Sequence, residues 1–290
     1  MPQQTNDAFS ALWKARFDHA IREREYYGRA SVWPRIRAYY EHRFQNTLDP
    51  NFNLIYMLAN SLVPALVFQQ PSIVNTARRP EYNYWASFFD GVDNWLVDEM
   101  ELQDVFGTAV LHTFLYNACG IQLGYDFSED GVESEEELVF KPIKGSVDRS
   151  RKTNQPWLDL IPPDRLLIAP GTTKIRNCPW FAKLVSLPTA RLKLRPGFKN
   201  VQATHIPQEV KDSRMGTMQV SEEYTSFYEV HNAEDGTYFC IDTNGHLIKP
   251  AQEDPLQVDG LPLTVITFNH ATGSIWGPPD AMYIETQLLE

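Results

Sequence analysis

The sequence predicts an α+β fold in which N-terminal helices are followed by a mostly antiparallel β region. Up to about residue 120, apolar side chains recur at helical spacing, as at Phe9, Trp13, Phe17 and Ile21. Beyond that point, short apolar runs alternate with Gly, Pro, Asn and Asp, a pattern typical of strands and turns. The 20 prolines outnumber the 15 glycines, which favours short strands over a helical bundle. Helices and strands segregated along the chain define the α+β class.

Residues 1–45 are predicted to form an N-terminal helical arm. Its first helix begins with Asn6 as a candidate N-cap, because Asn accepts hydrogen bonds from the free N–H groups of a helix start. The face opposite the aromatic stripe is charged, includes Glu23 and Arg24, and is expected to be solvated or packed on a neighbour. A second helix is expected near residues 35–44.

Residues 46–276 are predicted to form one α+β domain. An apolar helix is expected over residues 51–70, kinked or split at Pro64. The β-branched residues after it predict a strand at 71–80, and a two-part helix should follow from Tyr82 to Cys119. Gly120 is the expected C-terminal stop of that helix.

The β region is predicted from its apolar runs and turn residues. Strands are expected at 121–127, 136–143, 158–172, 180–187, 226–250 and 261–270, with a short helix at 188–194. Asp-Gly and Asn-Gly pairs supply the positive-φ positions of a meander within 226–250. The polar stretch 196–222 is expected to be a mobile excursion from the sheet.

Residues 277–290 read as the start of a further helix. Pro278 and Asp280 suit a first helical turn, and Ala281, Ile284 and Leu288 make an apolar stripe. The stripe ends without a cap and with a carboxylate in its last turn, which the helix dipole disfavours. We expect the helix, and the polypeptide, to continue past this sequence.

Composition excludes some functions. With 26 basic and 37 acidic residues the net charge is −11, which argues against tight phosphate binding to nucleic acid. The three cysteines, Cys119, Cys178 and Cys240, are far apart and favour reduced, buried thiols in a cytosolic compartment. The apolar stretch 52–68 contains Asn, Ser and Pro, so we expect a buried helix and no membrane contact.

Two charged runs stand side by side in the sequence. The stretch 128–137 is strongly acidic, and 141–152 is basic. The basic side chains are candidates for contacts between subunits or with DNA: Lys141, Lys144, Arg149, Arg151 and Lys152. A plain solvated loop is the usual explanation of such runs.

No catalytic, cofactor or metal residue is predicted. The best metal candidates are the polar residues of the meander, which match no calcium or zinc spacing: His231, Asp235, Cys240, Asp242 and His246. Asp164 with Glu209 is the nearest approach to a nuclease carboxylate pair, but we expect Glu209 outside any strand. His112, in an apolar run, is interpreted as a core histidine.

Four passages in order resemble the N-terminal half of tailed-bacteriophage portal proteins, also called head-to-tail connectors. They are "NFNLIYMLANSLVPALVFQQPSIVNTAR", "DVFGTAVLHTFLYNACGIQLGYD", "WLDLIPPDRLLIAPGTTKIRNCPWFAKLVSLPTARLK", and "FYEVHNAEDGTYFCIDTNGHLI" with "GLPLTVITFNHATGSIWGPPDAMYIETQLLE". In that family this half forms the wing, and the next helix begins the stem. The stem, clip, tunnel loop and crown have no counterpart in these residues.

The resemblance implies a structural protein and no enzyme. Its subunits form a homo-oligomeric ring, normally dodecameric, at one capsid vertex of the virion after assembly in the host cytoplasm. The ring contacts the capsid protein, the terminase and a tail adaptor, and double-stranded DNA passes through it without sequence specificity. Two alternatives stay open, a metal-dependent nuclease of the packaging machinery and an α+β enzyme with no familiar motif. Without the rest of the stem, residues 1–290 are expected to be monomeric or weakly associated.

Overall fold

A computed structural model describes residues 2–43, 53–126, 155–205, 210–212, 216–218, 223–256, 258 and 260–288. The helices are α1 (Pro2–Gly28), α2 (Trp33–Tyr40), α3 (Leu54–Leu66), α4 (Asn83–Glu99), α5 (Leu102–Tyr116), α6 (Thr189–Leu194) and α7 (Asp280–Leu288). The strands are β1 (Ala118–Asp126), β2 (Gln155–Ile161), β3 (Leu166–Ile168), β4 (Trp180–Pro188), β5 (Val210–Asp212), β6 (Gly216–Met218), β7 (Tyr224–Asn232), β8 (Thr237–Asp242), β9 (Leu247–Glu253) and β10 (Leu263–Thr267). The predicted α+β class is confirmed.

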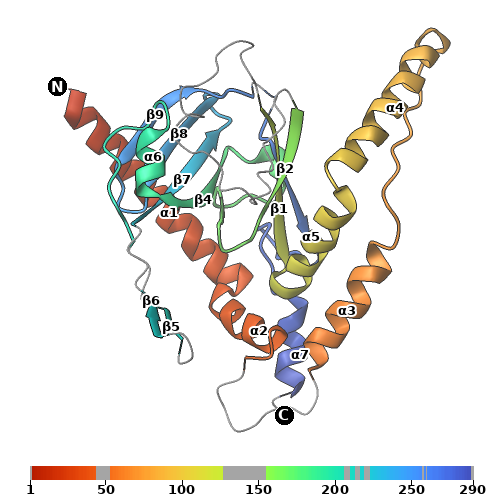
Figure 1. Ribbon diagram of the computed structural model, residues 1–290, viewed down its shortest axis with the longest axis horizontal. Helices are drawn as coiled ribbons and strands as arrows, with labels where there is room; N and C mark the ends of the chain where they lie inside the picture. Colours follow the sequence, from red (N-terminus) through yellow and green to blue (C-terminus); the bar gives the residue numbers. More distant parts are fainter. Residues whose placement is uncertain are drawn as a thin grey trace.

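Two sheets form the body of the protein (Figure 1). The larger has the order β3-β4-β7-β8-β9, and the smaller has the order β10-β1-β2. All strand pairs among the described residues are antiparallel. Gly236 and Gly245 adopt positive φ in the turns of the β7-β8-β9 meander, as the Asp-Gly and Asn-Gly pairs predict.

Helix α1 lies across the larger sheet and is part of its core (Figure 1). Trp13 is 4.9 Å from Phe239 and 5.4 Å from Trp180, measured between ring centroids. Phe17 is 4.7 Å from Tyr228 by the same measure. The predicted aromatic stripe is therefore the face that α1 buries against the sheet.

The charged face of α1 is not simply solvated, because Glu23 and Arg24 pack on other segments of the chain, which is the second of the two predicted alternatives. Arg24 Nη1 donates to the carbonyl oxygens of Pro163, Asp164 and Leu166 at 2.9–3.0 Å. Glu23 accepts hydrogen bonds from the Gly171 N–H and the Ser274 hydroxyl, each at 2.7 Å. Two adjacent charged residues thus fasten the end of α1 to the body.

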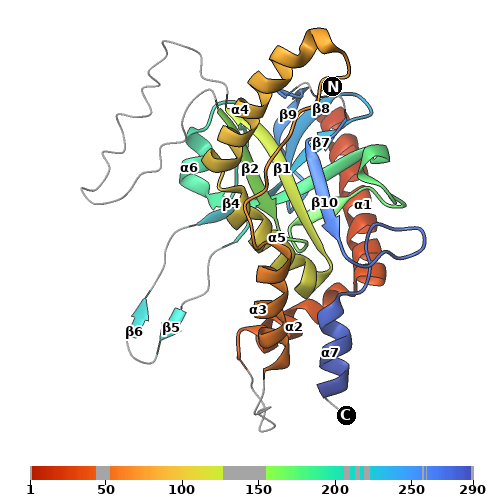
Figure 2. The same ribbon diagram turned by 90° about the vertical axis from the view of Figure 1, so that its right-hand side faces the viewer.

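Helices α2, α3, α5 and α7 form a second core at one end of the molecule (Figure 2). Ile36 of α2, Ile55 of α3, Phe114 of α5 and Ala281 of α7 are buried there against one another. The predicted final helix therefore begins inside a packed cluster of helices.

Three chain segments meet where this helical cluster joins the smaller sheet. The buried Asn117 amide donates to the Asn269 carbonyl oxygen and accepts from the Asn269 N–H, both at 2.7 Å. The Asn269 amide in turn donates to Asp280 Oδ1 at 2.7 Å. A Cβ on Gly277 would lie 2.4 Å from the Asn269 carbonyl oxygen. We call Asn117, Asn269, Gly277 and Asp280 the asparagine junction.

Three predicted boundaries at helix ends are wrong. Helix α1 begins at Pro2, so Asn6 lies inside it and does not cap it. Helix α3 continues past Pro64 to Leu66 and is not split, because the proline lies in its last turn. Helix α5 ends at Tyr116, and its C-cap Asn117 takes the left-handed conformation with φ 65°, whereas Gly120 lies within β1.

The predicted strand at 71–80 is also wrong, because this segment pairs with helix α4 and, among the described residues, with no strand. Asn94 of α4 accepts from the Ile73 N–H at 3.0 Å and donates to the Ile73 carbonyl oxygen at 2.8 Å. The Asn75 N–H donates to Asp90, and the Asn75 amide donates to Asp93 at 2.8 Å. Side chains of α4 thus supply the hydrogen bonds that a β-ladder would otherwise provide.

From the helical cluster, α3 leads into an arm made of residues 67–79 and α4, which extends away from the sheets (Figures 1 and 2). The chain runs out along α3 and residues 67–79 and returns along α4.

Among the later residues, the polar stretch 196–222 is predicted as an excursion. It contains the β5-β6 hairpin, which projects from the body in the same views. The strand expected at 136–143 lies outside the described residues.

Candidate functional site

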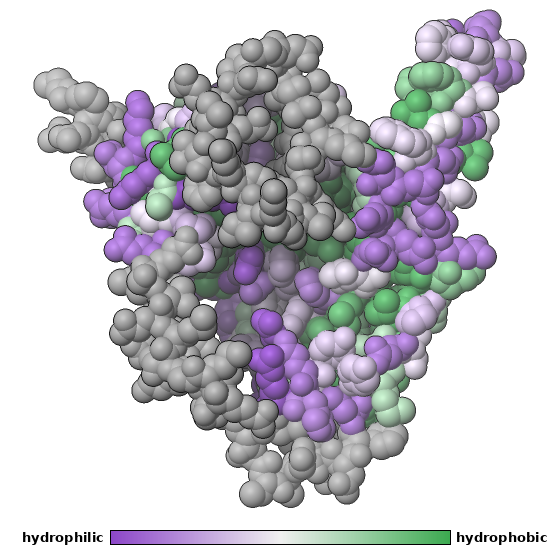
Figure 3. Space-filling view, viewed as in Figure 1, coloured by the Kyte–Doolittle hydropathy of each residue, from purple (hydrophilic) through white to green (hydrophobic). Residues whose placement is uncertain are grey.

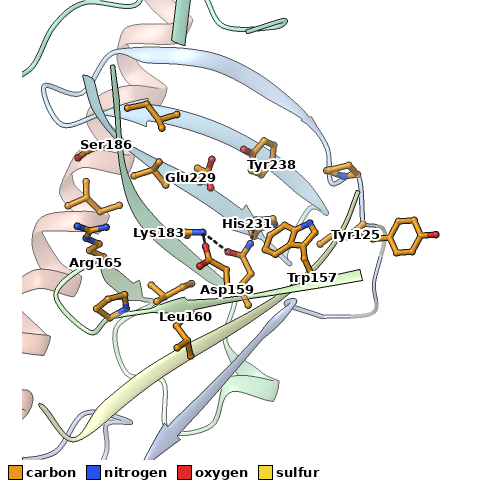
Figure 4. A pocket seen from close by; sticks show the side chains of 18 of the residues that line it. Tyr125, Trp157, Asp159, Leu160, Arg165, Lys183, Ser186, Glu229, His231 and Tyr238 are labelled. Atoms are coloured by element: carbon orange, nitrogen blue, oxygen red, sulfur yellow. Dashed lines mark hydrogen bonds and ion pairs between the residues drawn. The ribbon is translucent and has the colours of Figure 1, made fainter. Parts of the chain in front are cut away.

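A cleft of about 430 Å³ lies between the two sheets. Strands β1 and β2 form one wall, and β4, β7 and β8 form the other (Figure 4). Polar side chains enter it from both walls, although strands of this kind usually bury apolar residues.

A chain of polar contacts crosses the cleft. Lys183 of β4 forms an ion pair with Asp159 of β2 and donates to Gln122 Oε1 of β1 at 3.4 Å. Gln122 Nε2 is 3.3 Å from His231 Nε2 of β7, and His231 Nδ1 is 2.6 Å from Asp254 Oδ2. Five side chains are thereby connected, and Figure 4 shows Lys183, Asp159 and His231 among them.

The donors and acceptors of this network fix the tautomer of His231. Lys183 can only donate, so Gln122 accepts through Oε1 and presents its N–H₂ to the histidine. His231 Nε2 must then be the acceptor, and the proton sits on Nδ1, facing Asp254. Both ring nitrogens are engaged, and the ring stacks on Phe181 with centroids 4.9 Å apart. The arrangement joins the sheets and leaves His231 no free nitrogen to act as a base.

In this network, the surroundings of Asp254 shift the pKa of its carboxyl. Burial raises the pKa of its carboxyl, but hydrogen bonds from His231 and from the Leu256 N–H outweigh burial. The net effect is a pKa below the usual 3.8. The ionised form of Asp254 therefore contributes to the stability of the fold.

Because the folded carboxyl binds its proton at lower pH than the unfolded one, this stabilisation is present above about pH 4 and is lost as the pH falls below it. We expect the free energy of unfolding of the wild type to fall more steeply between about pH 5 and pH 3 than that of Asp254→Asn. Urea denaturation at each pH measures the difference. Glu234→Gln, at an exposed position in the same meander, should track the wild type. Parallel curves for wild type and Asp254→Asn would refute the assignment.

The buried thiols are poor nucleophiles. Burial raises the pKa of Cys119 and of Cys240 to about 12, and it also raises the pKa of Cys178. All three cysteines are free and buried, as the sequence predicts. His112 is half-buried with Nδ1 3.9 Å from Cys119 Sγ, and burial lowers its pKa. These groups are neutral at physiological pH, which suits packing more than reactivity.

The meander residues that were weighed as metal ligands do not converge on one point. Asp242 accepts from the His246 N–H and lies 2.9 Å from His246 Nδ1, so this pair is together. His231 pairs instead with Asp254, and Asp235 accepts from Thr237. Within the described ranges, no group of three or more His, Cys, Asp or Glu side chains could hold a metal ion.

Of the two carboxylates considered as a nuclease pair, the structure describes only Asp164. Asp164 lies in the turn between β2 and β3, where its carbonyl oxygen binds Arg24. Glu209 lies outside the described residues, but Val210 and Lys211 beside it belong to β5, which corrects the expectation that this stretch avoids strands. Among the described strands, β5 pairs only with β6, and it does not adjoin β2 or β3.

The acidic run 128–137 lies outside the described residues, as do all the basic candidates: Lys141, Lys144, Arg149, Arg151 and Lys152.

Comparison with known proteins adds no further constraint. No family model matches this chain, and no curated protein matches it significantly. Within the described residues, no helix combines the length and apolar character that crossing a bilayer requires.

Sequence reasoning missed most of the cleft network. Gln122 and Lys183 each interrupt an apolar strand, in "GIQLG" and "WFAKLV", and that interruption is the signal that could have found them. His231 was singled out, but for metal binding. Its true partner, Asp254, follows β9 and reaches the histidine only through the fold of the meander.

Proposed function

We propose that this protein is a portal, or head-to-tail connector, subunit that forms a ring at a capsid vertex. The observation that carries the proposal is the spatial order of the passages that resemble the family. The helix-to-strand passage at α5–β1 and the strand-to-helix passage at β10–α7 are neighbours, because Asn117 binds Asn269 in the asparagine junction. Segments 152 residues apart thus form one unit.

The packing of α7 supports the same proposal. Its first turn is held by Asn269 and by the buried Ala281, so the helix leaves the body in a fixed direction. A rigid exit is what a subunit needs if a following helix is to line a channel at a constant angle in every copy.

Charge supports a channel that does not retain DNA. The net charge of −11 disfavours phosphate binding, so double-stranded DNA could pass without being held. The proposed partners are the capsid protein, the terminase and a tail adaptor, with the virion as the location. The basic residues from Lys141 to Lys152 are proposed to contact the acidic run of a neighbouring subunit, since a ring repeats both charges around its circumference.

Light scattering on the protein expressed from its complete gene tests the proposal. We expect a closed homo-oligomer of about twelve subunits, as the resemblance implies, and no cleavage of plasmid DNA in Mg²⁺ or Mn²⁺. A stable monomer would contradict the ring. Cleavage that disappears in Asp164→Asn or Glu209→Gln would favour a nuclease instead.

A further inference from the structure

Strand β10 is an edge of the smaller sheet, on the side of β1 away from β2 (Figure 2). The Leu123 N–H donates to the Pro262 carbonyl oxygen at 3.1 Å, which fixes the residues of β10 that bind β1. Hydrogen-bonded positions alternate along an antiparallel pair, so Thr264 and Ile266 bind β1. The residues between them point their main-chain groups away from β1: Leu263, Val265 and Thr267.

Val265 and Thr267 offer these main-chain groups to a partner, because both residues are partly exposed, whereas Leu263 is buried. Among the described residues, no hydrogen bond reaches the N–H or C=O group of Val265 or Thr267. Each of the two therefore presents one donor and one acceptor at the open edge. Main-chain groups in this arrangement are the template on which another extended chain adds as a strand.

The other outer strands of the two sheets are protected against such addition, as edges in natural proteins usually are. Strands β9 and β2 each contain a proline, Pro250 and Pro156. Strand β3 has only 3 residues, and its Leu166 carbonyl oxygen accepts from Arg24 of α1. Strand β10 has the sequence LTVIT, with neither a proline nor a charge. It is the least protected edge in the described part of the two sheets.

An open edge differs from apolar surface alone, because it specifies the form of its partner. Helix α4 also exposes apolar side chains, among them Trp85 and Phe88, and its surface lies at the upper right of Figure 3. The main-chain groups of a helix are hydrogen-bonded within it, so α4 offers a partner side-chain contacts. At β10 a partner gains directional main-chain hydrogen bonds, which only an extended chain can form in register.

A groove of about 750 Å³ lies beside the open edge. Val265 and Thr267 line it, together with residues 173–176 and His270. Ile175 and Val265 pack against the same core, so Lys174 and Arg176, which flank Ile175, are held close to the edge. The groove therefore receives side chains of an added strand where its main chain pairs with β10.

The charge of this groove favours an acidic segment. Lys174 and Arg176 are exposed, and neither forms an ion pair with a described residue. Among the described residues that line the groove, none is Asp or Glu. The whole chain has a net charge of −11, so this local excess of positive charge departs from the average. It complements carboxylates on a partner.

We propose that the open edge of β10 binds an extended, acidic segment of a partner protein by strand addition. Main-chain groups of the segment pair with Val265 and Thr267, and its carboxylates lie near Lys174 and Arg176. Nucleic-acid phosphates would meet the two cations, but phosphate oxygens only accept hydrogen bonds and do not match the alternating donors and acceptors of a strand. The inference goes beyond the proposed ring, because the edge and the groove belong to a single chain.

Fluorescence anisotropy with a labelled peptide of alternating glutamate and valine, long enough to span the 5 residues of β10, tests the proposal. We expect saturable binding to the 290-residue chain. A peptide of alternating lysine and valine should bind at least about tenfold more weakly, because its charges repel those of the groove. The glutamate–valine peptide with methylated main-chain nitrogens should not bind, because it has no donors for the edge.

The double variant Lys174→Glu, Arg176→Glu should bind the acidic peptide at least about tenfold more weakly. Arg191→Glu, Lys193→Glu is the matched control, since it reverses an exposed arginine and an exposed lysine at the same spacing on α6. Val265→Pro should abolish binding, because it removes an N–H that does not bind β1, and proline is tolerated at such edge positions. Circular dichroism shows whether each variant is folded.

The proposal is overturned if the acidic peptide does not bind, or if the lysine peptide, the methylated peptide or the charge-reversed variant binds equally well. Binding of a DNA duplex in place of the acidic peptide, lost in the charge-reversed variant, would assign the groove to a nucleic acid instead. Peptide binding that is absent from the protein expressed from its complete gene would show that another part of the same polypeptide covers β10, which also overturns the proposal.

Failure of this inference can be told apart from failure of the proposed function. A ring that does not bind the peptide leaves the portal proposal standing without strand addition at β10. A protein that binds the peptide but forms no ring leaves strand addition standing without the portal proposal.

Discussion

Gly277→Ala is expected to lower the free energy of unfolding by about 3 kcal/mol. The added Cβ would lie 2.4 Å from the Asn269 carbonyl oxygen and 2.8 Å from Asn117 Nδ2. Both atoms belong to the hydrogen bond that joins β10 to the end of α5, so neither can move without weakening it. Urea denaturation followed by circular dichroism measures the change.

Gly91→Ala is the matched control for this prediction. Gly91 lies within α4, and a Cβ there meets nothing within 4 Å. Alanine should therefore stabilise the helix by about 0.5–1 kcal/mol. If Gly277→Ala unfolds within about 0.5 kcal/mol of the wild type, the asparagine junction is looser than its distances indicate.

Arg24→Met is expected to lower the free energy of unfolding by about 3 kcal/mol as well. The guanidinium donates to three carbonyl oxygens at 2.9–3.0 Å, and its Nε is buried without a partner. Burial lowers the pKa of Arg24, but arginine stays protonated in proteins, so the charge is retained. Methionine keeps much of the side-chain volume and leaves the carbonyl oxygens of the β2–β3 turn without this donor.

Arg22→Met separates this effect from a general loss of positive charge on α1. Arg22 is exposed on the same helix, and its removal should change the unfolding free energy by less than about 0.5 kcal/mol. Equal effects of the two substitutions in thermal denaturation would mean that Arg24 does not anchor the helix.

The elements that the sequence predicts correctly are marked by residues within the element itself. The β7-β8-β9 meander follows from Gly236 and Gly245 at its turns, because positive φ restricts those positions to few residue types. The aromatic stripe of α1 likewise identifies its buried face, as Trp13 and Phe17 show.

The missed features depend on distant partners. Residues 71–80 have the composition of a strand, but the hydrogen-bond partners of Ile73 and Asn75 come from α4 and could not be inferred from local pattern. Arg24 looks like a surface charge until the β2–β3 turn is placed beside it.

The candidate site could not be predicted either, because its residues also come from distant parts of the chain. Gln122 and His231 are 109 residues apart and meet because β1 and β7 belong to facing sheets. When only residue type and spacing are considered, the His, Cys and Asp residues of the meander suggest a metal site. The packing of the two sheets against each other, which brings Lys183 of β4 beside Asp159 of β2, carries the information that was lacking.

Electron microscopy of the protein expressed from its complete gene tests the central claim most directly. The portal proposal predicts single particles that average to a ring with cyclic symmetry, about twelve copies and an open central channel. Uniform particles without a central hole, whether monomers or compact dimers, would contradict it.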